Sequence, residues 1–178
     1  RATRPGMRGR TITVDSIGKT FSVTGWKIGW AVAAPALTTA FRGVHQFVTF
    51  CNATPFQEAA ADALALAATN GYYDELRAVY TARRDLLAGI LANAGLPTLP
   101  AAGSYFLLAD LARFGFADDA AFCRHLVTEI GVAAIPPSVF YADPITAPPL
   151  ARFCIAKRDE TMRRAAERLR RLRPVLYT

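Results

Sequence analysis

Hydrophobic and polar residues alternate near the start of the chain and then change to helical spacing. The alternation over residues 11–14 predicts a short strand, and the mostly apolar run over 26–33 predicts a second, more buried strand. Pro35 then opens a stretch that predicts a helix to about residue 47. The first part of the chain is therefore expected to form two strands followed by a helix.

The second helix has clear start and stop signals. Thr54 is expected at its N-cap, with Pro55 at the first helical position, where the missing N–H costs no hydrogen bond. Gln57 would complete a capping box with Thr54, and Gly71 supplies the stop.

A long amphipathic helix is predicted next, over residues 72–94, with Gly95 as its stop. Its apolar positions recur at helical spacing: Leu76, Val79, Tyr80, Leu87, Ile90 and Leu91. A helix of this length could connect two domains.

Short strands and helices alternate beyond this helix. Strands are predicted at 105–109, 132–135 and 152–156, and helices at 118–130 and 159–173. This mixture predicts a compact α+β domain for the second part of the chain. Because the first part also combines strands with helices, the fold class expected for the chain as a whole is α/β. The few elements before residue 70 would bury too little apolar surface alone, and we expect them to form the edge of a larger domain.

The composition is that of a folded globular protein. The 178 residues are 52% hydrophobic and 20% charged, which argues against disorder. No apolar run reaches the roughly 18 residues that a membrane-spanning helix needs, and no apolar leader follows the basic first residues. We therefore expect no membrane association.

The net charge of +7 raises the question of nucleic-acid binding. All but three of the 21 basic residues are arginines, and they are densest over 163–173. Apolar residues there share one helical face: Met162, Ala165, Ala166, Leu169 and Leu172. The arginines are then the solvated face of a terminal helix. Because no nucleic-acid-binding motif accompanies them, we expect no such partner.

The cysteines carry no metal-site signal. Cys51, Cys123 and Cys154 lie far apart with no C-x-x-C pair, and the chain has two histidines. We therefore expect no metal and a reducing compartment, most simply the cytoplasm.

Residues 16–30 carry the chemistry. Lys19 and Lys27, two of the chain's three lysines, lie here among glycines, hydroxyls and aromatic residues. A lysine enclosed by apolar groups is desolvated, which favours the neutral amine that attacks a carbonyl. A second lysine with hydroxyls nearby suits a bound phosphate. Pyridoxal 5′-phosphate (PLP) needs both an amine for its aldehyde and a cation for its phosphate.

The run S-x-G-K-T-F-S-x-T-G-W-K-x-G-W over residues 16–30 resembles the cofactor-lysine motif of the class I/II aminotransferases, which have PLP fold type I. It is most similar to the kynurenine, glutamine and methionine aminotransferase branch. Segments 43–46, 103–107 and 152–156 extend the resemblance, in order, over essentially the whole chain. The resemblance implies an α/β fold, with 1–71 ending the large PLP-binding domain, 72–95 forming an interdomain helix and 96–178 forming the small C-terminal domain.

The resemblance also implies roles for single residues. Lys19 would be the catalytic Schiff-base lysine that binds PLP and then transfers a proton. Ser16 and Lys27 would hold the cofactor phosphate. Arg152 would bind the substrate α-carboxylate through two parallel hydrogen bonds. Phe50 would be an aromatic residue that one subunit lends to its neighbour's substrate pocket.

Two further positions qualify this picture. Cys51 stands where several kynurenine aminotransferases carry histidine, and this departure argues against a preference for kynurenine as the substrate. Tyr105 and Phe106 are expected in the core of the small domain rather than at the ligand.

The family's remaining cofactor contacts lie upstream of the lysine motif. They include the phosphate loop, the ring-stacking aromatic residue and the aspartate on the pyridine nitrogen. We therefore expect the chain to be the C-terminal portion of an aminotransferase and to be inactive in isolation. The full-length enzyme would be a cytoplasmic homodimer that transfers an amino group from an aromatic, sulfur-containing or glutamine-like amino acid to a 2-oxo acid.

Two alternatives remain open. A β-lyase acting on cysteine conjugates would use the same lysine and arginine but eliminate a β-substituent. Alternatively, the chain could be a non-catalytic binding module with the arginine-rich helix as its contact surface.

Overall fold

The computed structural model describes residues 2–173 and divides into two compact units. The first unit ends at Tyr73 and the second begins at Asp74. Each unit has a two-stranded antiparallel sheet and its own buried core.

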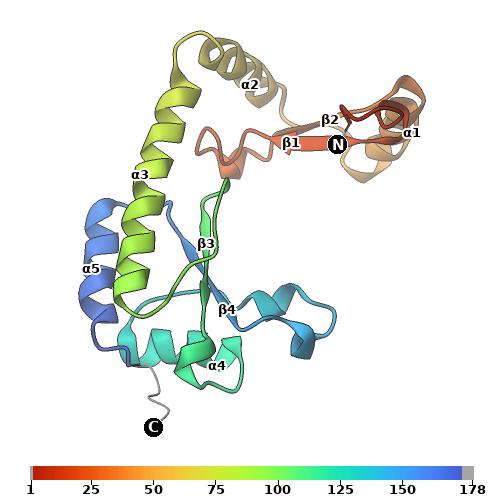
Figure 1. Cartoon of the computed structure of the whole chain (residues 1–178). Helices are drawn as coiled ribbons and strands as arrows, with labels where there is room; N and C mark the ends of the chain where they lie inside the picture. The colour runs from red at the N-terminus through yellow and green to blue at the C-terminus, as the bar shows by residue number, and fades with distance from the viewer. Residues whose placement is uncertain (1, 174–178) are drawn as a thin grey trace. The chain divides into compact units, whose positions relative to one another are not determined.

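The first unit contains the predicted strand pair and two helices (Figure 1). Strand β1 is Thr13–Ser16 and strand β2 is Gly29–Val32, and they pair with Ser16 opposite Gly29. Helix α1 is Pro35–Val48 and helix α2 is Thr54–Ala67. Strand β1 begins and ends two residues later than the predicted strand over 11–14, and β2 is shorter than the predicted strand over 26–33. Helix α1 ends one residue past its predicted limit.

The predicted capping box at the start of α2 is wrong. The helix already includes Thr54, Ala53 is its N-cap, and no side chain caps the first turn. The Gln57 side chain instead donates to the backbone oxygen of Asn52, at 2.8 Å. Because Thr54 has helical geometry, its hydroxyl is not in position to accept from the third residue of the turn. Gly71 adopts φ +79°, the left-handed conformation for which glycine is suited.

The core of the first unit is small. Ile17, Ile28 and Ala60 are its buried members, with Phe21, Val23, Trp26 and Leu64 packed around them. All four residues of β1 are exposed, and α1 has no buried residue. Val14 and Phe47 are 74% and 86% exposed. This unit therefore leaves much of its apolar surface uncovered, as a strand pair with little covering structure must.

The second unit is built on two paired strands and three helices (Figure 1). Strand β3, Phe106–Asp110, pairs antiparallel with β4, Leu150–Cys154, and Leu108 lies opposite Arg152. Helix α3, Tyr72–Asn93, begins at the end of the first unit and continues into this one. Helices α4, Asp119–His125, and α5, Asp159–Leu169, complete it.

These elements enclose a continuous hydrophobic core. Helices α3 and α5 lie side by side, and Arg83 of α3 pairs with Asp159 of α5 at 3.6 Å (Figure 1). Buried residues of this core come from both strands and from helices α3, α4 and α5, among them Leu87, Leu91, Leu107, Phe122, Phe153, Met162 and Leu169. The α5 residues Met162 and Leu169 belong to the apolar face expected from the sequence.

The helix predicted over 118–130 contains a change of helical type. Asp118 caps α4 by accepting from the Ala121 N–H at 2.6 Å. After His125 the chain continues as a π-helical turn, Leu126–Ile130, which ends at Gly131 with φ +76°. Arg168 and Arg171 each donate at 2.6 Å to the backbone oxygens of Gly131 and Ile130. Two arginines of the basic face thus satisfy the carbonyls at a helix end.

The strand predicted over 132–135 is wrong. Only Ile135 pairs, in a single bridge to Arg152. Pro136 and Pro137 follow it directly, and because proline has no backbone N–H, the ladder cannot continue past Ile135. The segment turns instead into a short 3-10 helix, Pro137–Phe140.

Within residues 2–173, no helix is both long enough and apolar enough to cross a membrane.

Cys123 provides a test of the second core. It is 5% exposed, and burial raises the pKa of its thiol to about 11, with the charge of Asp119 acting in the same direction. Because the thiolate is the reactive form, Cys123 should resist iodoacetamide from about pH 7 to about pH 9 and react only once urea unfolds the chain.

Peptide mass spectrometry of the alkylated protein checks this, with the exposed Cys51 as the reactive control. Equal labelling of Cys51 and Cys123 in the folded chain would contradict the packing.

Candidate functional site

Lys19 lies on a loop whose two ends are fixed by buried isoleucines. Ile17 is 1% exposed and Ile28 is 7% exposed, and the Ile17 N–H donates to the Ile28 oxygen at 3.3 Å. Inside the loop, the Phe21 N–H donates to the Ile17 oxygen at 3.0 Å, and the Thr24 hydroxyl donates to the Gly18 oxygen at 3.0 Å. These bonds hold the lysine in a compact turn between β1 and β2.

Aromatic residues of the motif attach this loop to the helices. Phe21 stacks on Tyr72 with ring centroids 5.1 Å apart, and the Tyr72 hydroxyl donates to the Thr20 oxygen at 2.5 Å. Trp26 stacks on Phe56 of α2 at 4.9 Å. Phe21 and Trp26 of the lysine motif therefore support the loop by packing against neighbouring helices.

The site residues expected in the first unit line one hollow. Its volume is about 850 Å³, and Ser16, Lys19, Lys27 and Phe50 are all among its lining residues. Arg42 and His45 of α1 also line it. Sequence reasoning gave neither residue a role at the site, although segment 43–46, which contains His45, was part of the resemblance to the family.

The expected enclosure of Lys19 by apolar groups is wrong for the described chain. Lys19 and Lys27 are both exposed. The buried residues next to Lys19 fix the loop, but they leave its side chain in solvent. Desolvation of this lysine therefore needs further covering atoms beyond those of residues 2–173.

The backbone is strained at two of the expected site residues. Lys27 has φ +56° and Phe50 has φ +68°, values in the left-handed region that non-glycine residues rarely adopt. Each costs about 1 kcal/mol or more relative to a relaxed conformation. Such strain persists only where the surrounding structure or function requires it, and both residues line the same hollow.

Arg152 lies in β4 of the second unit, against two aromatic rings. Its guanidinium carbon is 4.1 Å from the centre of the Phe106 ring and 4.9 Å from that of Phe140. Its Nε is buried and has no hydrogen-bond partner among the described residues. Arg152 and Phe106 also line a cavity of about 360 Å³. The aromatic contacts thus hold a cation that retains unused donors.

Phe106 and Phe140 add to what the sequence indicated. Phe106 was expected in the core, but it is half-buried and covers the guanidinium, whereas Tyr105 packs against the core. Phe140 was not singled out at all. Its only signal was an aromatic residue within the proline-rich loop.

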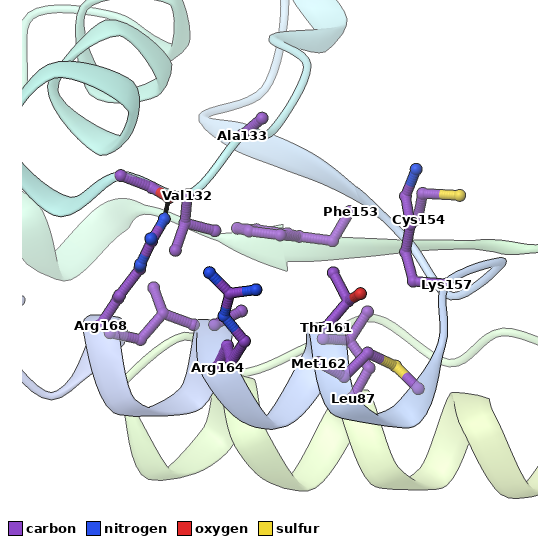
Figure 2. Close-up of a pocket in the computed structure, with 13 residues that line it drawn as sticks. Leu87, Val132, Ala133, Phe153, Cys154, Lys157, Thr161, Met162, Arg164 and Arg168 are labelled. Atoms are coloured by element: carbon purple, nitrogen blue, oxygen red, sulfur yellow. Dashed lines mark hydrogen bonds between the residues drawn. The ribbon is translucent and has the colours of Figure 1, made fainter.

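Another cavity, of about 320 Å³, lies between α5 and β4 (Figure 2). Apolar residues such as Phe153 and Met162 line it together with Arg164 and Arg168 of α5. None of the expected site residues lines it. Across residues 2–173, no group of three or more His, Cys, Asp or Glu side chains could hold a metal ion.

Comparison with known proteins gives a family. Residues 2–169 match the family described as aminotransferase class I and II. The chain is 45% identical over 168 residues to a methionine aminotransferase from Escherichia coli, covering 94% of this chain and 43% of that protein. It is 38% identical over 190 residues to a kynurenine–oxoglutarate transaminase from Dictyostelium discoideum, covering 97% and 44%. The chain thus spans less than half the length of these relatives.

Solved structures of aminotransferases also match the chain over nearly its whole length. The crystal structure of the Escherichia coli methionine aminotransferase matches with a TM-score of 0.88 and 44% identity, over 96% of this chain and 44% of that one. N-succinyldiaminopimelate aminotransferase from Mycobacterium tuberculosis matches with a TM-score of 0.86 and 41% identity, over 97% and 44%. The expected α/β fold, that of the fold type I aminotransferases, is confirmed.

Gly29 offers a test of the strand pair that carries the lysine loop. A Cβ at this position would lie 2.7 Å from the Asp15 backbone oxygen, so Gly29→Ala must push β1 and β2 apart. We expect a cost of about 1–3 kcal/mol and faster amide hydrogen exchange over residues 11–33, measured by mass spectrometry.

Gly25→Ala is the matched control, because a Cβ at Gly25 would have nothing within 4 Å. Unchanged exchange in Gly29→Ala would show that the strands do not pair in this register.

Proposed function

Because the chain belongs to the class I and II aminotransferase family, we propose that the full-length protein is a PLP-dependent aminotransferase. It moves an amino group from an amino acid to a 2-oxo acid. The observation that carries the proposal is the shared hollow, in which Ser16, Lys19 and Lys27 converge. Because the chain spans less than half of its relatives, the activity is assigned to the whole protein.

The donor set of this hollow fits PLP. The cofactor carries an aldehyde and a phosphate, and the hollow offers a primary amine at Lys19, a hydroxyl at Ser16 and a second cation at Lys27. The volume of about 850 Å³ lies within the ordinary range for ligand pockets. When bound, PLP supplies a conjugated ring that withdraws electrons from the substrate Cα.

Lys19 performs two tasks in this proposal. Its amine would hold the cofactor through the aldehyde, and with substrate bound the same amine would accept a proton from the substrate Cα. The buried ends of its loop fix the backbone from which this amine extends. Ser16 would donate its hydroxyl hydrogen to the phosphate, and Lys27 would neutralise part of the phosphate charge.

Arg152 orients both substrates through the group that they share. Amino acids and 2-oxo acids both carry a carboxylate next to the reacting carbon, and a planar guanidinium binds a carboxylate through two parallel N–H donors. A ring against the guanidinium face leaves the in-plane donors free for this task. The unpartnered Nε is consistent with a ligand completing the site.

We extend the proposal to the assembly and the substrates. In a homodimer, Phe50 of one subunit would enter the neighbour's substrate pocket, and the remainder of the large domain would cover the exposed strands and Lys19.

The proposed boundaries remain 1–71, 72–95 and 96–178, with α3 as the connecting helix. A sulfur-containing or aromatic donor is favoured by the methionine and kynurenine aminotransferases among the relatives, and a glutamine-like donor remains part of the proposal through the resemblance of the lysine motif. A cytoplasmic location agrees with three free cysteines.

Lys19→Ala tests the cofactor assignment. In the full-length enzyme it should abolish the visible absorption band of lysine-bound cofactor and lower kcat by at least about 10²–10⁴-fold, because both the covalent link and the proton acceptor are lost. Borohydride reduction followed by peptide mass spectrometry locates the trapped cofactor.

Lys157→Ala is the matched control, since Lys157 is the remaining lysine of the chain and lies outside the hollow. Cofactor trapped on any residue other than Lys19 would refute the assignment.

Arg152→Ala tests the carboxylate assignment. The full-length variant should keep its cofactor band while KM rises about 100-fold for every amino-acid and 2-oxo-acid substrate, since charged hydrogen bonds contribute about 1.5–3 kcal/mol each. Arg152→Lys should restore only part of the affinity, because an ammonium lacks the planar fork.

Steady-state kinetics with two donors and two acceptors measure the effect, and Arg163→Ala on α5 serves as the control for lost positive charge. A KM that rises for one substrate class alone would contradict the assignment.

A further inference from the structure

The segment after Ile135 connects Arg152 to helix α4. Ile135 and Arg152 exchange both backbone hydrogen bonds, at 3.0 and 2.9 Å. The chain then forms the short 3-10 helix Pro137–Phe140, which ends with the ring that contacts the Arg152 guanidinium. This segment therefore touches Arg152 at both its backbone and its side chain.

Asp119 holds the other side of this short helix. It is the first residue of α4, is 4% exposed, and its Oδ2 accepts from the Ser138 N–H at 2.8 Å. Ser138 is itself 8% exposed, so the bond lies in the interior. A buried carboxylate that accepts a backbone N–H makes a stronger hydrogen bond than a neutral acceptor does.

Asp118, the preceding residue, has a different task. Its side chain accepts from Ala121 within α4 itself and so caps the helix. Asp119 binds outside its own helix, 19 residues further along the chain. Two adjacent aspartates thus separate a local capping role from a long-range one.

We propose that Asp119 is a positioning residue for Arg152, acting through the Ser138 N–H and the Phe140 ring. The inference rests on the proposed role of Arg152 as the carboxylate-binding residue. Phe140 is 64% exposed, so packing alone does not fix its ring. Without the Asp119 bond, the 3-10 helix loses its hydrogen bond to α4, and the Phe140 ring at its end restricts the orientations of the guanidinium less.

The expected consequence is a change in affinity without a change in chemistry. A guanidinium that samples several orientations must be ordered by each substrate when the substrate binds, which weakens binding of the carboxylate. The amine of Lys19 and the cofactor contacts lie in the first unit and are untouched. In the full-length enzyme, Asp119→Ala should therefore raise KM about tenfold with kcat within about twofold of wild type.

Three variants make the test specific. Asp119→Asn keeps an oxygen that can accept from Ser138 and should recover most of the loss. Asp118→Ala removes the cap of the same helix, at a cost of about 1 kcal/mol in stability, and should leave KM within about twofold. Phe140→Leu removes the exposed ring without disturbing the core and should reproduce the higher KM even where Asp119→Ala proves too unstable to purify.

A double-mutant cycle with Arg152 separates the positioning role from the carboxylate-binding role. In the Arg152→Ala background, Asp119→Ala should add no further increase in KM. Equal KM changes in Asp118→Ala and Asp119→Ala, or a wild-type KM in Phe140→Leu, would overturn the positioning role. A wild-type KM in Arg152→Ala would instead overturn the proposed carboxylate-binding role of Arg152. A raised KM in Arg152→Ala with a wild-type KM in Asp119→Ala would overturn the positioning role alone.

Discussion

The packing of Ile17 and Ile28 against Ala60 is the constraint on which the candidate site depends. These three residues form the buried hydrophobic cluster around the lysine loop, and the two isoleucines fix both ends of the loop that carries Lys19 and Lys27. A long, flexible lysine side chain can act on one atom only if its backbone is held. The aromatic stacks of Phe21 and Trp26 extend this support to the neighbouring helices.

The second unit uses aromatic packing for the same purpose. Two rings contact the Arg152 guanidinium, and within residues 2–173 none of the salt bridges involves Lys19, Lys27 or Arg152. An acidic neighbour would orient each cation but would also compete with an anionic ligand for it. Packing orients the same groups and leaves their charge available for a phosphate or a carboxylate.

The sequence predicted elements best where a repeating pattern determined them. The helix expected over 72–94 is Tyr72–Asn93, because its apolar spacing persists over many turns. Local signals were weaker: the capping box at Thr54 failed because the helix starts one residue earlier than the motif implies. The motif located Lys19, but it could not reveal that Phe140 lies over Arg152. That contact depends on the backbone bridge between Ile135 and Arg152 and on the hydrogen bond that the Ser138 N–H donates to Asp119.

The sequence led us to expect Lys19 among apolar groups, but its side chain is exposed. The neighbouring strands are exposed as well, and both observations have the same cause. β1 and β2 present apolar residues such as Val14 and Val32 to solvent, at 74% and 62% exposure, beside the lysine loop. Both observations describe one surface that lacks covering atoms. Residues of both strands, among them Val14 and Trp30, also line the hollow that contains Lys19. In the proposed function, loss of water would favour the neutral amine at Lys19 and would strengthen the attraction between Lys27 and a phosphate, so both roles would depend on the same covering of this surface.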